Sequence, residues 1–378
     1  MYDIVVVGAG PSGSFLSYSL AKSGMKVLTI EEHSEIGRPV ECTGVVTKRV
    51  FNFVHSKSIA NVVHGARVFF PGEDPIHISK GEETVIIQRD SFDKDVASMA
   101  IDAGAEMQLG ARLTAVTRGS EGWAVSFKKD GNVLQEKAKV IVGADGANST
   151  VRRLLHGEMP KRVVSTYQAE IPTRMQSQDD VDVYLGSEVS RGFFGWAVPA
   201  GNISRVGVGT FGPGAKDYFQ RICRKFGFSG SLSITGGPIP VSYLKRTYGN
   251  GYLLIGDAAG IVKPLTGGGI YTGIVSASEA SRAILEAYEM NNFSERILSR
   301  YQRYWKNALG RELSLDGLVQ KIFSVIGDRG LDRIFKFLSR EDMLEMINSY
   351  GDIDYPSRLI MKLLTRKPSL LFTLIPGF

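Results

Sequence analysis

Three glycine-rich turns, far apart in the chain, have the composition of sites that bind phosphate and ribose groups. Each turn directly follows a short apolar run, and the turns span residues 8–13, 143–146 and 256–260. The first has the spacing Gly-x-Gly-x-x-Gly, which permits a sharp turn, lets a pyrophosphate approach the backbone and lets the next helix pack on the strand. Because a helix N-terminus offers unpaired N–H groups and a positive dipole end, the predicted chemistry is pyrophosphate binding.

An acid about 20 residues further on, at the end of the second strand, should hold a ribose diol. Residues 27–30 form that strand, and Glu31 follows it. Glu32 is the adjacent candidate, although the alternation of a strand points it to the other face. One such turn could belong to an ordinary βαβ unit, but three in this order indicate bound FAD. The residues expected at the phosphate and ribose end are Gly8, Gly10, Pro11, Ser12, Gly13, Glu31 and Glu32.

Residues 263–270, named here the flavin seat, are predicted to hold the isoalloxazine ring. Three consecutive glycines there expose backbone N–H groups at the start of a helix pattern. A helix N-terminus stabilises the negative charge that develops on the N1–C2=O side of reduced flavin. The expected cofactor contacts in the flavin seat are Pro264, Gly267, Gly268, Gly269 and Ile270.

Composition and charge exclude several classes of protein. The 378-residue chain is 43% hydrophobic and 22% charged, as is ordinary for a globular protein. Its 45 basic and 39 acidic side chains leave a net charge of +6, which is too modest and too dispersed to predict nucleic-acid binding. Two cysteines, Cys42 and Cys223, exclude a disulfide framework but not a single bridge. The chain begins directly in a strand pattern and has no apolar run of about 18 residues, so we expect a cytoplasmic protein without a signal peptide or a membrane span.

The element patterns predict an α/β fold, with a Rossmann-like FAD-binding domain, an inserted antiparallel-sheet substrate domain and a C-terminal helical region. Strand and helix patterns alternate at the start, whereas short alternating strands such as 181–185 and 205–209 indicate an antiparallel sheet. We assign residues 1–60, 84–158 and 251–290 to the FAD-binding domain, 61–83 and 159–250 to the substrate domain, and 291–378 to the helical region.

An interrupted nucleotide domain with an inserted sheet resembles the flavoprotein class of para-hydroxybenzoate hydroxylase over most of residues 1–290. The resemblance implies that Asp145 and Gly146 lie near the FAD pyrophosphate, and that Gly256 and Asp257 present an acid to the ribityl chain. It implies that Arg89 reaches the ribityl and phosphate side, where a guanidinium forms charge-assisted hydrogen bonds. The alternatives are a helix-start ion pair for Arg89 and plain turn residues for the two aspartates. Leu113, on a predicted strand, is a further expected cofactor contact.

Related proteins usually carry an acid where this chain has Lys263. The lysine either points inward, where it adds positive charge to the flavin seat, or is a solvated surface residue.

Two further stretches, residues 38–44 and 194–199, resemble the geranylgeranyl reductase family, which includes archaeal digeranylgeranylglycerophospholipid reductases. The second stretch follows the family pattern aromatic-x-Trp-x-aromatic-Pro, except that Val198 replaces the second aromatic. The resemblance implies an FAD-dependent enzyme that saturates C=C bonds of the geranylgeranyl chains of isoprenoid membrane lipids. It implies that the first stretch passes the flavin edge, with Arg38, Cys42, Thr43 and Gly44 as cofactor contacts.

A prenyl chain offers no polar group, so its affinity must come from buried apolar area, about 0.8 kcal/mol per CH₂. The expected substrate residues, which line a tunnel if the resemblance holds and are otherwise plain sheet core, are Phe193, Phe194, Trp196 and Pro199.

The expected reaction adds hydride from flavin N5 to one alkene carbon and a proton to the other. Trp196 is a catalytic candidate because its π face could steady positive charge. Cys42 is another, as a proton donor or flavin modulator, although it could instead be a small buried hydrophobe. No histidine lies in a flavin motif, so the sequence names no histidine as the acid. There is no second Gly-x-Gly-x-x-Gly turn, so NADPH or reduced ferredoxin is expected to dock transiently as electron donor.

Residues 355–378 form a tail with Arg358, Lys362, Arg366 and Lys367 among apolar residues and no acid. A basic amphipathic tail predicts peripheral binding to a membrane surface, on the inner face for a cytoplasmic protein. The alternative is a helix that packs its apolar side on its own protein.

Two other functions compete with the reductase. An FAD-dependent monooxygenase or halogenase of a hydrophobic substrate would use the same scaffold. An electron-transfer flavoprotein feeding a quinone would bind FAD and a membrane but reduce no alkene. Such carriers usually add an iron–sulfur cluster, and two cysteines are too few to ligate one.

Overall fold

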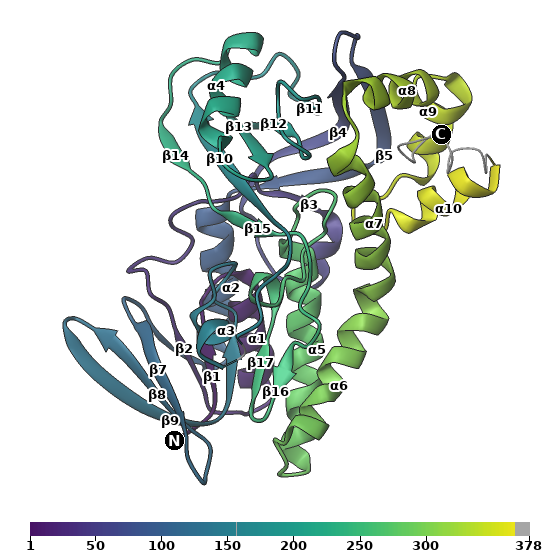
Figure 1. Ribbon diagram of the computed structural model, residues 1–378. Helices are drawn as coiled ribbons and strands as arrows, with labels where there is room; N and C mark the ends of the chain where they lie inside the picture. Colours follow the sequence, from purple (N-terminus) through teal and green to yellow (C-terminus); the bar gives the residue numbers. More distant parts are fainter. Residues whose placement is uncertain (156, 367–378) are drawn as a thin grey trace.

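Two sheets stacked end to end organise the molecule, and helices join them along one side (Figure 1). The computed structural model describes residues 1–155 and 157–366. Its mixed α/β architecture confirms the prediction from the sequence. It has a Rossmann-like part, an antiparallel sheet and a helical C-terminal part.

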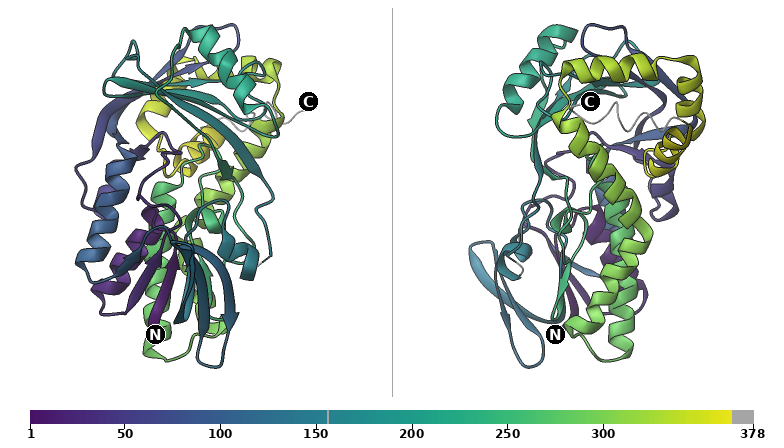
Figure 2. Two further views of the ribbon diagram at one scale, coloured as in Figure 1. Left: turned by 90° about the vertical axis from the view of Figure 1, so that its left-hand side faces the viewer. Right: turned by 45° about the vertical axis from the view of Figure 1, so that its right-hand side comes forward.

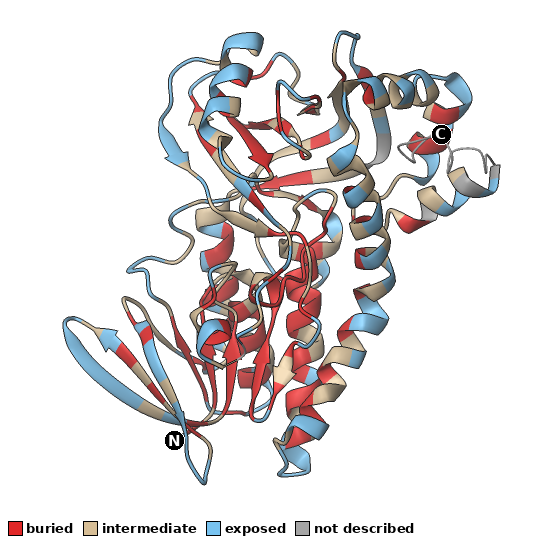
Figure 3. Ribbon diagram, viewed as in Figure 1, coloured by how far each residue is buried: buried red, intermediate tan, exposed pale blue. Residues whose placement is uncertain are grey.

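The first sheet is parallel at its centre, where β1 (Tyr2–Val7) lies between β2 (Val27–Ile30) and β9 (Asn132–Gly143). Strand β17 (Tyr252–Leu254) extends this parallel array beyond β9 and β6 (Glu106–Gln108) extends it beyond β2, whereas β16 (Tyr248–Gly249) pairs antiparallel at the edge. The β1 run is almost fully buried, as expected for a parallel sheet that is covered on both faces. Figure 3 shows that burial is concentrated in these strands and in the helices against them.

Helices α1 (Pro11–Lys22), α2 (Arg89–Asp102) and α5 (Ile270–Glu289) form a packed layer, in which α1 contacts both other helices. Two strands, β7 (Arg112–Arg118) and β8 (Trp123–Lys129), join the far end of β9 as an antiparallel extension that projects from the body. Short helices close the two later turns: α3 (Thr150–Leu155) follows β9, and the 3₁₀ turn η2 (Gly256–Ala259) follows β17.

The second sheet has nine strands and is antiparallel except for the pair β4–β11. Its strands are β3 (Val45–Thr47), β4 (Ile59–Phe69), β5 (Ile76–Ile87), β10 (Val163–Ile171), β11 (Asp180–Tyr184), β12 (Gly195–Ala200), β13 (Ile203–Thr210), β14 (Ser233–Thr235) and β15 (Pro238–Pro240). Helix α4 (Ala215–Phe226) packs on one face of this sheet. Because β5 runs through residue 87, the predicted limit at residue 84 falls inside one strand; the other domain limits stay predictions.

The C-terminal helices bridge the two sheets. Helix α6 (Glu295–Trp305), the π-helical turn η3 (Lys306–Gly310) and α7 (Arg311–Val325) follow one another as a long rod (Figure 2). Three shorter helices, α8 (Asp328–Leu338), α9 (Glu341–Tyr350) and α10 (Ser357–Arg366), gather beside the second sheet. The predicted tail continues into residues 367–378, which lie outside the described residues. None of the helices within residues 1–155 and 157–366 has the length and apolar character needed to cross a membrane.

Candidate active site

The first glycine turn leaves the N-terminus of α1 free to bind an anion. Gly8 has φ of +102°, and a Cβ there would lie 2.5 Å from the carbonyl oxygen of Ala144 in the second turn. A Cβ on Gly13 would collide with the carbonyl oxygen of Gly8, whereas one on Gly10 would meet nothing within 4 Å. Helix α1 begins at Pro11, and no side chain in the described part of the chain caps its first N–H groups. The turn therefore fits a pyrophosphate.

Glu31 lies against this turn, and Glu32 does not. The Glu31 Oε2 accepts the N–H of Ala9 at 2.8 Å, and its Oε1 accepts the N–H of His33 at 3.0 Å. The side chain of Glu31 is 12% exposed, whereas that of Glu32 is 57% exposed and faces Arg112 at 3.6 Å. The geometry thus favours Glu31 as the ribose acid. Leu113 is buried on the strand beside it.

In the second turn, the carboxylate of Asp145 holds the turn and the next helix together. It accepts hydrogen bonds from the hydroxyl of Ser149 at 2.5 Å and from the N–H groups of Thr150 and Val151 at 2.7 and 3.0 Å. Gly146 beside it has a positive φ of +68°. The Asp145 side chain is therefore engaged as a turn residue, and its contact with the pyrophosphate stays a prediction.

The third turn carries a carboxylate that needs donors. No described residue hydrogen-bonds the side chain of Asp257, which lies 2.6 Å from where a Cβ on Gly269 would stand. Burial raises the pKa of Asp257 to about 6, and the charge of Arg89 opposes this rise. A desolvated carboxylate without a donor is costly, and the hydroxyl groups of a ribityl chain are the donors that it lacks. This unpaired acid is the observation that best fits FAD here.

Arg89 forms the helix-start ion pair that the sequence left open as an alternative, and its contact with FAD stays a prediction. Its Nε and Nη2 bond the carboxylate of Asp93 at 2.8 and 2.6 Å, so the helix-start ion pair exists. Burial lowers the pKa of Arg89, but the charge of Asp93 and a hydrogen bond with Cys42 outweigh it, and the net pKa is raised. The guanidinium therefore joins α2 to Cys42 and acts electrostatically on Asp257. Arg38, by contrast, is exposed and pairs with Asp90 at 3.0 Å.

A buried arginine that the sequence analysis missed fixes the Cys42 loop to the second sheet. Arg205 on β13 is fully buried and donates to the carbonyl oxygens of Thr43 and Ile87 at 2.8 and 2.9 Å. It also acts electrostatically on Cys42, and burial lowers the pKa of Arg205 itself. The Gly44 backbone approaches it so closely that a Cβ would lie 2.8 Å from its Nη1. The available signal was a charged residue inside an otherwise apolar strand.

The two cysteines are free, which excludes the single bridge that the sequence left possible. Cys223 lies on α4, in the apolar cluster on that side of the second sheet, whereas Cys42 lies beside Arg89. The Cys42 Sγ accepts the N–H of Gly44 at 3.4 Å.

The aromatic residues of β12 and the preceding turn form a continuous wall, named here the aromatic wall (Phe193, Phe194 and Trp196). Phe193 and Phe194 stack with centroids 4.3 Å apart, and Phe194 meets Trp196 edge-on at 6.0 Å. The Trp196 Nε1 donates to Gln168 at 3.1 Å. Phe193 Cζ lies 3.5 Å from where a Cβ on Gly267 would stand, so the wall reaches the flavin seat.

Pro199, the fourth predicted substrate residue, lies on the other face of β12. Side chains alternate along a strand, so Trp196 and Val198 share one face, while Gly195, Ala197 and Pro199 share the face on which α4 packs. Val198, which replaces the family aromatic, therefore lies on the Trp196 face.

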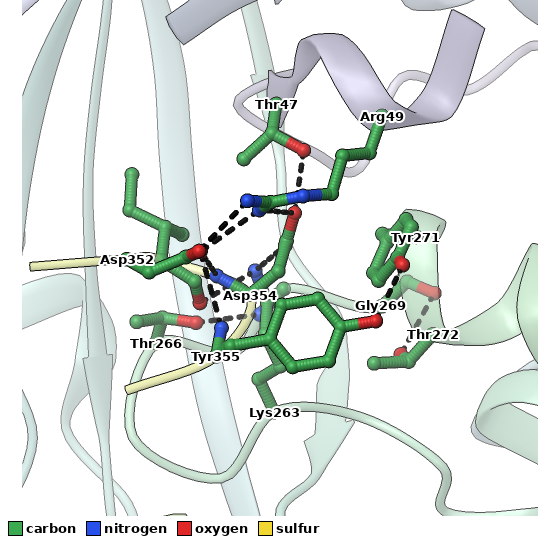
Figure 4. Close-up of polar contacts among 12 residues, drawn as sticks. Thr47, Arg49, Lys263, Thr266, Gly269, Tyr271, Thr272, Asp352, Asp354 and Tyr355 are labelled. Atoms are coloured by element: carbon green, nitrogen blue, oxygen red, sulfur yellow. Dashed lines mark hydrogen bonds and ion pairs between the residues drawn. The ribbon is translucent and has the colours of Figure 1, made fainter. Parts of the chain in front are cut away.

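Lys263 points inward, under the flavin seat. Lys263 is 6% exposed as a whole residue, and its Nζ lies 2.8 Å from Asp354 Oδ1 (Figure 4). The backbone of Lys263 also closes the loop, because its carbonyl accepts the N–H of Gly267 and its N–H donates to Gly268. A Cβ on Gly268 would lie 2.8 Å from the Lys263 Cε. The interpretation of Lys263 as a solvated surface residue is therefore wrong.

The acid that pairs with Lys263 comes from the segment between α9 and α10, which sequence analysis did not connect to the site. Asp354 also accepts the hydroxyl of Thr47 at 2.5 Å, and the neighbouring Asp352 binds Arg49 through two bonds of 2.9 and 2.8 Å. The hydroxyl groups of Tyr271 and Tyr355 meet at 2.7 Å (Figure 4). These contacts tie residues 352–355 to the flavin seat and to residues 47–49.

A glycine turn at a helix N-terminus, an acid bonded to that turn and a buried acid without a described donor fit the class of FAD-dependent oxidoreductases. The FAD binding domain family model matches residues 1–228. The digeranylgeranylglycerophospholipid reductase of Methanocaldococcus jannaschii is 30% identical, over 98% of this chain and 97% of that protein. The chain belongs to the digeranylgeranylglycerophospholipid reductase family, and the resemblance seen at residues 38–44 and 194–199 is confirmed. Its cofactor is FAD.

One solved structure agrees with this assignment, and another shares the fold. A geranylgeranyl bacteriochlorophyll reductase-like protein from Thermoplasma acidophilum superposes with a TM-score of 0.88 at 26% identity, over 99% of both chains. A probable FAD-dependent monooxygenase from Pseudomonas aeruginosa superposes with a TM-score of 0.67 at 20% identity, over 89% of this chain and 99% of that one. The second likeness shows a shared fold alone.

Proposed function

We propose that this protein is an FAD-dependent reductase that saturates C=C bonds in the geranylgeranyl chains of isoprenoid membrane lipids. The observation that carries the proposal is the near full-length similarity to a digeranylgeranylglycerophospholipid reductase. The position of the aromatic wall against the flavin seat supports it, because an apolar chain needs an apolar surface beside the ring. A pocket of about 190 Å³ opens beside Phe193, but it is lined by Tyr218 and the residues that join α7 to α8 and by no residue of the flavin seat.

The residues of this chain bind, orient and shield the reactants. FAD, when bound, supplies the hydride. Glu31 and the α1 N-terminus would hold its ribose and phosphates, Asp257 would accept from its ribityl hydroxyls, and the flavin seat would offer backbone N–H groups to its ring. Trp196, held by Gln168, offers its π face to the positive charge that develops on the alkene. Cys42, between two guanidinium groups, borders the same space as a modulator of the ring.

An anaerobic single turnover tests this function. The protein is reduced with dithionite and mixed with a geranylgeranyl lipid in the absence of oxygen. We expect the flavin spectrum to reoxidise and the lipid to gain two hydrogens per double bond. Reoxidation that waits for oxygen, with the lipid mass unchanged, would favour a monooxygenase, a halogenase or an electron carrier instead.

The proposal also covers the electron donor and the cellular location of the protein. NADPH or reduced ferredoxin re-reduces the flavin, and a cytoplasmic protein meets its lipid at the inner membrane face. Helix α10 supports membrane contact, since Met361 is 45% exposed on it near the basic Lys362. Flotation with anionic liposomes, with and without residues 356–378, checks this; equal flotation of both proteins would refute a role for the tail.

A further inference from the structure

Asp316 on α7 is a buried acid with an unsatisfied oxygen. The residue is 2% exposed, and no described residue bonds its Oδ1. The carboxylate accepts one backbone N–H, from Leu265 in the flavin seat. A buried carboxylate with a single donor is unstable in its charged form, and the protonated form needs a hydrogen-bond acceptor or a reaction partner for its O–H. Nothing described so far uses this group.

The placement of Asp316 joins the flavin seat to the aromatic wall. Pro264 packs against α7 at Gly317, where an added Cβ would lie 3.8 Å from it. One turn beyond Asp316, the Gln320 Nε2 donates to the carbonyl oxygen of Gly192 at 3.1 Å, directly before the aromatic wall begins. Asp316 and Gln320 are both buried, so one face of α7 runs from the flavin seat to Phe193. This face of α7 therefore connects the residues predicted to hold the ring with the residues predicted to hold the prenyl chain.

The charges around Asp316 suit a group that gives up a proton and takes it back. Burial raises its pKa to about 6, and Glu312 on the same helix adds to this rise. Lys263, from the flavin seat, acts in the opposite direction. Lys263 stays bonded to Asp354, and Glu312 accepts from the hydroxyl and N–H of Ser357. The carboxylate left after proton loss is therefore stabilised by the charge of Lys263 and the N–H of Leu265.

We propose that Asp316 is the acid that protonates the alkene during prenyl reduction. The O–H bond of Asp316 breaks as a C–H bond forms at one alkene carbon. The other carbon receives the hydride that reduced FAD supplies, so the C=C bond becomes CH–CH and FAD is left oxidised. Water then returns a proton to Asp316. Reduced FAD would be restored by a hydride from a nicotinamide, or by two electrons from an iron–sulfur protein together with a proton from water. This inference rests on the proposed function.

The test compares Asp316→Asn and Asp316→Glu with wild type in anaerobic single turnovers across pH. General acids contribute about 10²- to 10⁴-fold, so we expect Asp316→Asn to slow flavin reoxidation by that factor and to remove its dependence on pH near 6. Asp316→Glu should restore part of the rate. Asp332→Asn, which changes an exposed acid on α8, is the matched control and should behave as wild type. Unchanged FAD binding and reduction by dithionite show that the variants are folded.

A second readout does not depend on turnover. Infrared spectra of holoenzyme carrying ¹³C-labelled aspartate should show a protonated carboxyl that titrates near pH 6 and is missing from Asp316→Asn. The inference fails if Asp316→Asn keeps the wild-type rate and pH profile, or if the rate is lost only in Cys42→Ser. If wild type reduces no lipid, the proposed function fails by itself, and the infrared titration still reports whether Asp316 holds a proton.

Discussion

At the scale of single residues, carboxylates of similar type have different tasks because their surroundings differ. Asp145 is saturated by three donors of its own turn, whereas Asp257 has none. Glu31 bonds the phosphate turn, whereas its neighbour Glu32 lies in solvent. Spacing identified each of these acids, but only the hydrogen-bond partners distinguish a structural acid from one that is ready to bind a ligand.

Glu31 and Glu32 form a matched pair for a binding experiment. Glu31→Gln removes the charge that accepts the Ala9 N–H and that we expect to bind the ribose diol. Hydrogen bonds to charged groups contribute about 1.5–3 kcal/mol, so FAD affinity should fall about 10- to 100-fold. Glu32→Gln should leave affinity unchanged. Titration of apoprotein with FAD, followed by flavin fluorescence, measures both; equal effects would show that the two carboxylates are interchangeable.

At the scale of elements, the flavin seat depends on a segment from the far end of the chain. Lys263 and Asp354 are 8% and 1% exposed in their side chains, and their charged atoms lie 2.8 Å apart. Their separation of 91 positions explains why the sequence could not pair them. The same applies to Arg205, which contacts residues 43 and 87 and so has meaning only after the two sheets meet.

A double-mutant cycle measures this link. Removing one partner of a buried ion pair costs about 3–5 kcal/mol, because the other charge stays buried without a counter-charge. We expect Asp354→Asn, which leaves Lys263 without its acid, to lower the free energy of unfolding strongly. Lys263→Met should lower it less, because Arg49 Nη1 stays 3.3 Å from Asp354 Oδ2, and the double variant should lose less than the sum.

Lys336 and Asp332 provide the control for that cycle. They also lie 2.8 Å apart, but their side chains are 68% and 39% exposed. Exposed pairs couple by at most about 1 kcal/mol. A coupling of the same size in both pairs, measured by denaturant unfolding, would show that burial does not strengthen the link between Lys263 and Asp354.

At the scale of the whole molecule, local sequence patterns were enough to predict the fold. They did not predict which side of a strand, loop or helix each side chain lies on. Glycine turns and apolar runs are short-range signals, so the parallel sheet, the FAD turns and the aromatic wall followed from them. The position of Pro199 on the face under α4, the inward path of Lys263 and the role of Asp316 depend on how the two sheets and the rod of α6 and α7 meet. That packing is not encoded in any one stretch.

The free energy of unfolding should depend on pH because Asp316 is a buried acid with a raised pKa. The pKa of Asp316 is about 6 in the folded protein and about 3.9 when unfolded, so the unfolded state loses its proton first as pH rises. The folded state is therefore destabilised progressively between these values, by about 2–3 kcal/mol in total. Asp316→Asn cannot ionise, so at pH 7 we expect it to be more stable than wild type.

Urea unfolding of the holoprotein at several pH values checks this expectation. The advantage of Asp316→Asn should shrink as pH falls from about 6 toward about 4, because Asp316 is then protonated in both states. Asp257 is present in both proteins and cancels from the comparison. An advantage that does not change with pH would contradict a raised pKa at this position.

The contact between residues 352–355 and the flavin seat also sets an order of events during synthesis. Lys263 leaves the ribosome long before Asp354, and until then it has no described acid within bonding distance to bury it. The flavin seat is thus completed only once the segment between α9 and α10 has been made and has packed against it. A chain shortened before residue 352 would therefore keep Lys263 without the buried acid that it pairs with, and we expect its flavin seat to stay open.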